Sequence, residues 1–125
     1  MIHLDTNVLA QLPLLLKTRH PVIARVSAGD AAATGAMAWY EFMNGPVQPE
    51  DVQLALRFVE QRVLPIDRAQ AELAAELFNQ TGRRRALRFD IMVAAAAISN
   101  GAELFTFNVA DFKPFVPMGL KLLPA

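Results

Sequence analysis

Short apolar runs recur along this chain, separated by longer segments in which apolar residues follow a helical spacing. Apolar runs of about four to eight residues bounded by turn residues are typical of buried strands, whereas a repeat of about 3.6 residues is typical of a helix. Strands that alternate with helices indicate βαβ units and a mostly parallel sheet. Strands are expected at residues 1–4, 31–35, 63–66, 104–107 and 120–123, and helices at 8–16, 21–26, 36–44, 49–62, 67–81 and 90–100. Within 8–16, Pro13 is expected either to confine the helix or to begin a second one.

Turn and cap residues support these boundaries. Gly45-Pro46 ends the helix expected at 36–44, and Pro49-Glu50-Asp51 is a favourable start for the next one, since acids there face the positive end of the helix dipole. Asp67 and Gln70 have the spacing of a capping box. No repeat or linker divides the chain. We therefore expect one α/β domain over residues 1–125, with a short parallel sheet of about four to five strands flanked by helices.

The composition narrows the class of protein. With 125 residues, 54% of them hydrophobic, the chain suits a single globular domain. Lys plus Arg and Asp plus Glu both number 12, so the total charge does not favour nucleic acid, although a local basic patch stays open. The absence of Cys excludes disulfides and thiolate metal sites. We expect a cytoplasmic protein without a signal peptide or a membrane segment.

Four acids occupy positions that solvation explains poorly: Asp5 ends the first strand, Glu41 lies in the apolar segment 39–43, Asp90 opens the Ala-rich helix, and Asp111 follows the strand at 104–107. Strand ends and the helix starts after them share one rim of a parallel sheet, where ligands bind in open α/β folds. The acids are therefore expected to converge at that rim. Taken singly, each has an ordinary alternative: an N-cap for Asp5 and Asp90, a solvent-facing side chain for Glu41, and a turn residue for Asp111.

Crowded carboxylates repel one another and raise each other's pKa unless a cation neutralises them. Oxygen ligands without Cys or clustered His favour a hard ion, Mg²⁺ or Mn²⁺. Such an ion suits phosphodiester hydrolysis, because it lowers the pKa of an attacking water and stabilises the leaving oxygen. His3 is instead expected to be a hydrogen-bonded residue of the first strand.

The same segments carry a resemblance to a known family. In chain order they are residues 4–9 (LDTNVL), 39–42 (WYEF), 90–97 (DIMVAAAA) and 105–112 (FTFNVADF). Together they resemble the motifs of PIN-domain ribonucleases, and most closely the VapC-type toxins of bacterial toxin–antitoxin pairs. Phe107 stands where many relatives have a basic or polar residue, and residues 45–51 match none of the family's motifs.

The resemblance implies an endoribonuclease that depends on Mg²⁺ or Mn²⁺, works as a homodimer, and is blocked by a cognate antitoxin protein. By position, Asp5 and Asp90 would be the main metal ligands, and Glu41 and Asp111 would complete the acidic group. Thr6 and Asn108 would orient ligands or RNA by hydrogen bonds. Arg85 and Arg88, in a basic loop with Arg83 and Arg84, are candidate contacts for RNA phosphates, or simply part of a solvated loop.

Two other functions stay open. A PIN-like module without catalysis could bind RNA or a protein. An Asp-based phosphotransferase would need a second acid two residues after Asp5, where this chain has Asn7. Nucleophilic catalysis and a glycine-rich phosphate loop find no support, because neither an elbow motif nor such a loop is present.

Overall fold

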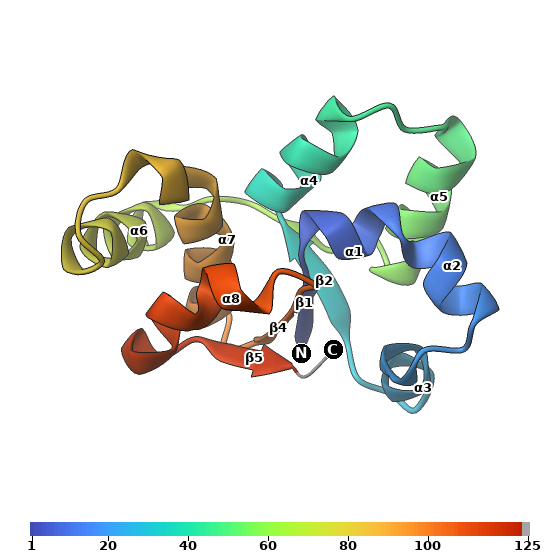
Figure 1. The fold of residues 1–125 in the computed structure, drawn as a ribbon. Coiled ribbons are helices and arrows are strands. Elements are labelled where there is room, and N and C mark those ends of the chain that lie inside the picture. Colours follow the sequence, from blue (N-terminus) through green and yellow to red (C-terminus); the bar gives the residue numbers. More distant parts are fainter. Residues whose placement is uncertain (124–125) are drawn as a thin grey trace.

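The computed structural model describes residues 1–123 and shows a parallel sheet of five strands with helices on both faces (Figure 1). In chain order the elements are β1 (Ile2–Leu4), α1 (Thr6–Ala10), α2 (Leu12–Lys17), α3 (Pro21–Ser27), β2 (Ala32–Gly35), α4 (Ala36–Asn44), α5 (Pro49–Phe58), β3 (Val63–Leu64), α6 (Arg68–Gln80), η1 (Arg85–Leu87), α7 (Arg88–Ser99), β4 (Glu103–Phe105), α8 (Val109–Phe112), η2 (Lys113–Met118) and β5 (Lys121–Leu123). The predicted α/β class with a short parallel sheet is confirmed. Residues 124 and 125 of the predicted domain lie outside the described residues.

The first strand is the centre of the sheet, whose order is β3-β2-β1-β4-β5. Ile2 of β1 is in register with Ala32 of β2 on one side and with Glu103 of β4 on the other. All neighbouring strands run parallel, so their carboxyl ends lie along one edge. From β1 the chain adds β2 and β3 on one side of the sheet, and then β4 and β5 on the other. In doubly wound sheets, this change of direction opens a crevice for ligands at the carboxyl ends of the strands.

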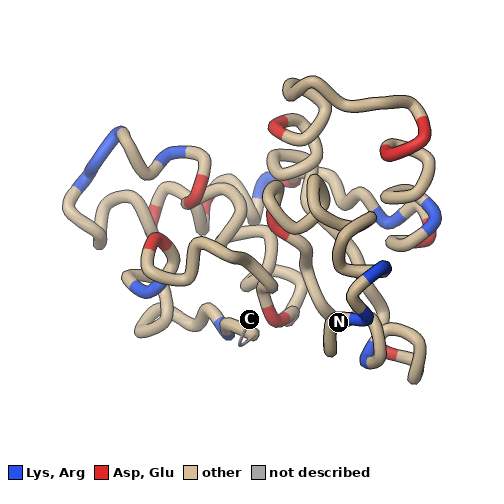
Figure 2. The backbone as a smooth tube through the Cα atoms, turned by 45° about the vertical axis from the view of Figure 1, so that its right-hand side comes forward, with Lys and Arg blue, Asp and Glu red and all other residues tan. Residues whose placement is uncertain are grey.

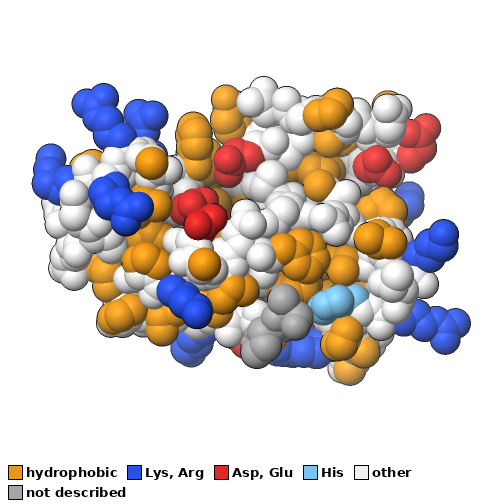
Figure 3. Space-filling view, in the orientation of Figure 1, with side chains coloured by type: hydrophobic (Ala, Val, Ile, Leu, Met, Phe, Trp, Pro, Cys, Tyr) orange, Lys and Arg blue, Asp and Glu red, His pale blue; other side chains and the backbone are white. Residues whose placement is uncertain are grey.

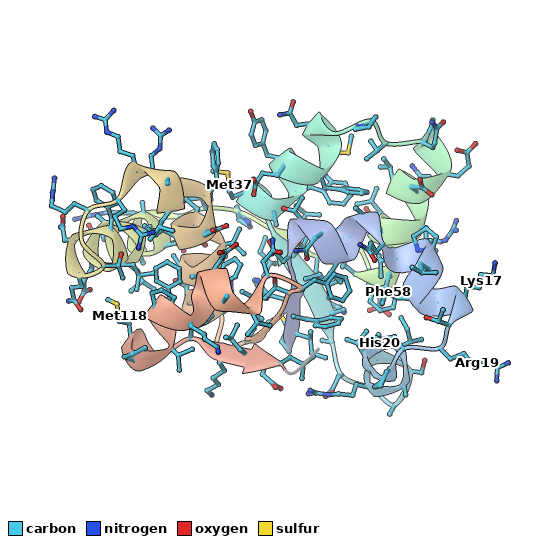
Figure 4. The ribbon with its side chains drawn as sticks, in the orientation of Figure 1. Lys17, Arg19, His20, Met37, Phe58 and Met118 are labelled. Carbon is cyan, nitrogen blue, oxygen red and sulfur yellow. The ribbon has the colours of Figure 1, made fainter. Side chains whose placement is uncertain are left out.

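Two hydrophobic clusters, one on each face, hold the sheet. Because side chains alternate along a strand, Leu4 and Phe105 join the cluster that packs against α1, α2, α3 and α5, while Leu104 joins the cluster built from α6, α7 and η2. Figure 1 shows the first set of helices to the right of the sheet and the second set to its left. Met37 of α4 packs against the second cluster and extends toward α7 (Figure 4). Helices thus cover both faces of the sheet, and the edge formed by the carboxyl ends of its strands remains for a site.

One glycine is required by close packing between a strand and a helix. A Cβ added to Gly35, at the end of β2, would lie 3.0 Å from the Cβ of Ala96 in α7. The small residues of α7, buried at Ala94, Ala95, Ala96 and Ala97, allow this helix to lie close to the sheet, as its Ala-rich sequence predicts. The close approach brings the first turn of α7 to the edge where β1 and β2 end.

Several predicted boundaries were wrong, and the reasons are local. At residues 8–16 the second helix that Pro13 could begin is present, with Pro13 in the first turn of α2, but the first helix already begins at Thr6. The helix expected at 49–62 ends at Phe58, because Glu60 and Gln61 turn into the left-handed region at φ 51° and 66°. The strand expected at 104–107 is Glu103–Phe105, and the loop expected after it contains α8.

Two predictions about hydrogen bonds of polar side chains are corrected, and both side chains, His3 and Gln70, are buried. The hydrogen-bonded role expected for His3 was wrong in part: its side chain is 2% exposed, and its Nε2 has no hydrogen-bond partner among the described residues. The capping box is half formed: Asp67 accepts a hydrogen bond from the backbone N–H of Gln70 at 2.8 Å, but within residues 1–123 the Asp67 N–H donates none to the Gln70 side chain. The Nε2 of Gln70 is buried and has no partner there. Within residues 1–123, no helix is long and apolar enough to cross a bilayer.

Candidate active site

The candidate site lies where β1, β2 and β4 end. Asp5 directly follows β1, and Thr106 directly follows β4 at the neighbouring position, because Leu4 pairs with Phe105. The helix α4 begins immediately after β2 and places Glu41 above the same edge, and α4 packs against both α1 and α7. A cavity of about 270 Å³ opens there. Its lining residues are Asp5, Thr6, Asn7, Ala10, Glu41, Asp90 and Asn108.

Asp5 is held by two hydrogen bonds, one to each carboxylate oxygen. The backbone N–H of Thr6 donates to Oδ1 at 2.8 Å, and the buried hydroxyl of Thr106 donates to Oδ2 at 2.7 Å. Asp5 is the N-cap of α1 as well as a cavity residue, so its two interpretations are compatible. Burial raises the pKa of Asp5, the two hydrogen bonds oppose this, and the charge of Asp111 adds to it. The carboxylate is therefore fixed in orientation yet poorly neutralised.

Glu41 is linked to the same corner through Thr6. The Thr6 hydroxyl lies 3.4 Å from Oε1 of Glu41 and 3.2 Å from the backbone O of Ala38, both within reach of its single proton. Glu41 is partly buried rather than facing solvent, and it lines the cavity. Burial, followed by the negative charge of Asp5, raises its pKa. Thr6 thus lies between two acids that repel each other.

Asp90 was expected to open its helix as a possible cap, and that position is corrected. The 3₁₀ turn η1 leads directly into α7, so the helix starts at Arg88 and Asp90 lies within its first turn. The side chain is partly buried and lines the cavity together with Glu41, whose helix α4 packs against α7. Burial and the charges of Asp5, Asp111 and Glu41 raise the pKa of Asp90 to about 6. Four acids from distant parts of the chain therefore affect one another electrostatically.

Asp111 and Asn108 lie at the outer side of this group. Asp111 is not in the loop that was expected but in the short helix α8, where it is exposed and is not among the residues that line the cavity. Its charge is nevertheless close enough to raise the pKa of both Asp5 and Asp90. Asn108 lines the cavity, and its backbone N–H donates to the Thr106 hydroxyl at 3.0 Å. In the space-filling view, acidic side chains gather near the centre of one face (Figure 3).

Two residues of the site were missed by sequence reasoning. Thr106 orients Asp5, and Asn7 lines the cavity and accepts a hydrogen bond from the backbone N–H of Phe107 at 3.4 Å. A signal for Thr106 was available, since a Thr at the end of an apolar strand, beside an acid at the end of the neighbouring strand, needs a partner when buried. Asn7 carried no such signal, because its contact depends on how the chain leaves β4.

The comparison with family models agrees with this arrangement. A model described as PIN domain matches residues 2–113, which is most of the chain and includes all four acids. The chain belongs to the PIN-domain family. Among curated proteins, no sequence matches it at a significant level.

Solved structures with the same fold are distant in sequence. The structure of FitAcB from Neisseria gonorrhoeae has 19% identity to this PIN domain and a TM-score of 0.70, covering 99% of this chain and 97% of that one. VapBC-1 from nontypeable Haemophilus influenzae has 20% identity and a TM-score of 0.68, over 98% and 97%. A toxin–antitoxin complex from Klebsiella pneumoniae has 23% identity and a TM-score of 0.66, over 90% and 91%. At these identities the likeness shows the fold.

The predicted arginine contacts lie outside the acidic cavity of this PIN domain. The loop between α6 and α7 carries the run of basic positions at one end of the molecule (Figure 2). Arg88 lines a separate apolar hollow between α6 and α7, and its Nε donates to the backbone O of Arg85 at 3.1 Å. Arg83 lies over the ring of Phe78 at 5.3 Å and bonds to Asn79. A role in RNA binding for Arg85 and Arg88 stays a prediction.

The donor atoms of the cavity suit a hydrated hard ion. Carboxylate, amide and hydroxyl oxygens line it, and these are the ligands of Mg²⁺ and Mn²⁺. Within residues 1–123, no three His, Asp or Glu side chains lie close enough together to hold an ion directly. Mg²⁺ usually keeps several waters and is bound through only one or two carboxylates, so this spacing fits a hydrated ion near Asp5 and Asp90. The raised pKa of Asp5, Glu41 and Asp90 shows that these acids are not neutralised by a residue of the described chain.

Proposed function

We propose that this PIN domain is an endoribonuclease that depends on Mg²⁺ or Mn²⁺, and that it is the toxin of a toxin–antitoxin pair. The observation that carries the proposal is one cavity lined by Asp5, Glu41 and Asp90, in which each of these acids has a raised pKa. Maintaining such repulsion costs free energy in a metal-free protein. Acids placed in this way are typical of a functional site.

The residues of the chain have distinct proposed roles. Asp5, fixed by Thr6 and Thr106, and Asp90 would hold the ion, while Glu41 and Asp111 would hold waters or a second ion. The ion, when bound, would lower the pKa of a water and stabilise charge on the leaving oxygen of a phosphodiester. Asn108, at the mouth of the cavity, would position the RNA backbone by hydrogen bonding.

The proposal is tested by RNA cleavage with purified protein. Cleavage is expected with Mg²⁺ or Mn²⁺ and not with EDTA, and Asp5→Asn should lower the rate by more than about 100-fold, beyond the effect of losing an outer partner of a metal ligand. Asn caps a helix as well as Asp does, so the variant should keep its fold. Glu76→Gln, on the exposed side of α6, is the matched control and should cleave normally. Equal cleavage by wild type and Asp5→Asn would refute the assigned site.

The toxin role is supported by the neighbours in fold, one of which is itself a toxin–antitoxin complex. Induced expression of the chain alone is expected to arrest growth, and expression of Asp5→Asn is not. A homodimer and a cytoplasmic location are part of the same proposal, and light scattering of the purified protein tests the dimer. Growth arrest that persists in Asp5→Asn would separate toxicity from this cavity.

A binding module without catalysis is the alternative with an observation in its favour, namely that no three acids within residues 1–123 are assembled to hold an ion directly. Titration calorimetry with Mn²⁺ distinguishes the two. If Mn²⁺ binds to the wild type and more weakly to Asp90→Asn, the nuclease is supported. If Mn²⁺ does not bind to the wild type and no RNA is cleaved, the binding module is supported. The phosphotransferase is disfavoured, since Asn7 stands at the position of the required second acid and its amide oxygen is engaged by Phe107.

A further inference from the structure

A second cavity, of about 300 Å³, adjoins the acidic one. Its lining residues are Thr6, Ala10, Glu41, Phe42, Gly45, Pro46, Val47 and Asp51. Thr6, Ala10 and Glu41 also line the acidic cavity, so the two spaces share a wall. The far wall comes from Gly45, Pro46 and Val47, in the connection from α4 to α5, and from Asp51, in the first turn of α5. All four lie within residues 45–51, which matched none of the motifs in the sequence. This side cavity is therefore built by the part of the chain to which no role has been given.

The side cavity is lined by both apolar and acidic side chains. Phe42, Pro46, Val47 and Ala10 form apolar walls, and the partly buried carboxylate of Asp51 lies on the polar side. Among residues 1–123, no side chain or backbone group donates a hydrogen bond to Asp51, and no Lys or Arg lines the cavity. A phosphate would be repelled here. A flat group with apolar faces and hydrogen-bond donors on its edge would be accepted.

We propose that the side cavity binds the base of a nucleotide next to the scissile phosphate, with Asp51 accepting hydrogen bonds from the base's amino edge. The inference rests on the proposed ribonuclease function: the side cavity shares Thr6, Ala10 and Glu41 with the acidic cavity, so it lies within reach of the nucleotide next to a bond cleaved there. Unstacked bases of single-stranded RNA are recognised by apolar contact with their faces and hydrogen bonds to their edges. Guanine fits best, since its N1–H and amino group can donate side by side to the two carboxylate oxygens.

The preference for a base rather than a cationic protein side chain follows from position. The cavity adjoins the place of the proposed phosphodiester cleavage, with which it shares Thr6, Ala10 and Glu41, and its walls are apolar on more than one side. Uracil would leave Asp51 with one donor at most, since its edge carries carbonyl oxygens on either side of its single N–H. A paired contact of this kind is worth about tenfold or more in discrimination between bases.

The experiment measures kcat/KM for single-stranded RNA substrates that differ only in the base beside the cleaved bond. The wild type is expected to prefer guanine over uracil by about tenfold at one position, and Asp51→Asn to reduce this preference to near unity without changing the Mg²⁺ requirement. Glu50→Gln removes the same charge from the same helix turn, but Glu50 is exposed and does not line the cavity, so it should keep the preference. An unchanged preference in Asp51→Asn overturns the proposal.

A second variant covers the case in which Asp51→Asn fails to fold. The φ of Gly45 is −82°, and a Cβ there would meet only the backbone O of Phe42, at 3.6 Å, so Gly45→Val is accommodated and narrows the cavity. It should lower kcat/KM for guanine more than for a pyrimidine. Equal losses would contradict a base in this space.

Binding in EDTA separates this inference from the proposed function. Fluorescence anisotropy with short oligonucleotides should show tighter binding of guanine-containing than of uracil-containing RNA, lost in Asp51→Asn. Such binding without any cleavage would refute the nuclease and retain the base site. Cleavage without any preference between bases would support the nuclease and refute the base site. Inhibition by N-acetyl-arginine amide that Asp51→Asn relieves, with no base preference, would assign the cavity to a cationic protein side chain instead.

Discussion

Replacement of Asp90 by Asn should stabilise the metal-free protein at neutral pH while it abolishes RNA cleavage. The pKa of Asp90 is raised from 3.8 to about 6, mainly by burial and then by the charges of Asp5, Asp111 and Glu41. An acid whose pKa is higher in the folded state keeps its proton longer there than in the unfolded chain. Its contribution to stability is therefore complete below pH 3.8 and is lost as the pH rises through 6.

The size of the effect follows from this pKa. Taken in full, the change corresponds to about 3 kcal/mol, but the side chain is only partly buried, so solvent screening reduces it to about 1 kcal/mol. The loss of a favourable charge in the first turn of α7 offsets part of the gain, by about 0.3–1 kcal/mol. The variant should therefore equal or exceed the wild type in stability above pH 7, and its unfolding free energy should fall less between pH 4 and pH 7.

The assay is urea unfolding in EDTA at several pH values from 4 to 8, for wild type, Asp90→Asn and Glu50→Gln. Glu50 lies in the first turn of α5, is exposed and is outside both cavities, so its variant loses the helix-dipole interaction without relieving any crowding. Added Mn²⁺ should stabilise the wild type and not Asp90→Asn. If Asp90→Asn is clearly less stable than Glu50→Gln above pH 7, and its unfolding free energy depends on pH as that of the wild type does, then the acids do not repel one another.

Further predictions concern the supports of the site and the core. Thr106→Val should cost about 1–2 kcal/mol in unfolding free energy and slow cleavage, since it leaves Oδ2 of the buried Asp5 without its donor. The pKa of His3 is lowered to about 4 by burial, so up to about 3 kcal/mol of stability should be lost as the pH falls from 6.5 to 4; His3→Leu should flatten that part of the unfolding curve. Gly35→Ala should cost about 1–3 kcal/mol in a thermal melt, because its Cβ would press on Ala96.

Local patterns in the chain were sufficient for the architecture. Apolar runs that alternate with helical spacing predict a parallel sheet, and the structure has five parallel strands. The acid that ends the first strand was correctly expected at the carboxyl edge, because the position of a residue relative to its own strand is a local property. Glu41 was identified by its apolar neighbours and Asp90 by its place at the start of the Ala-rich helix, and both line the cavity with Asp5.

The order of elements, the sheet type and the identity of the acids could be predicted from the sequence, since these depend on periodicity and on residue type. Which side chains meet could not, because it depends on the tertiary structure. The register of β1 with β4 places Thr106 on Asp5, and the helical turn α8 carries Asp111 to the outer side of the group. The packing of α5 brings Asp51, in the first turn of that helix, to the cavity beside the acidic one. Contacts of this kind join residues far apart in the chain. Their geometry is set by packing between elements, which cannot be derived from the spacing of residues along one element.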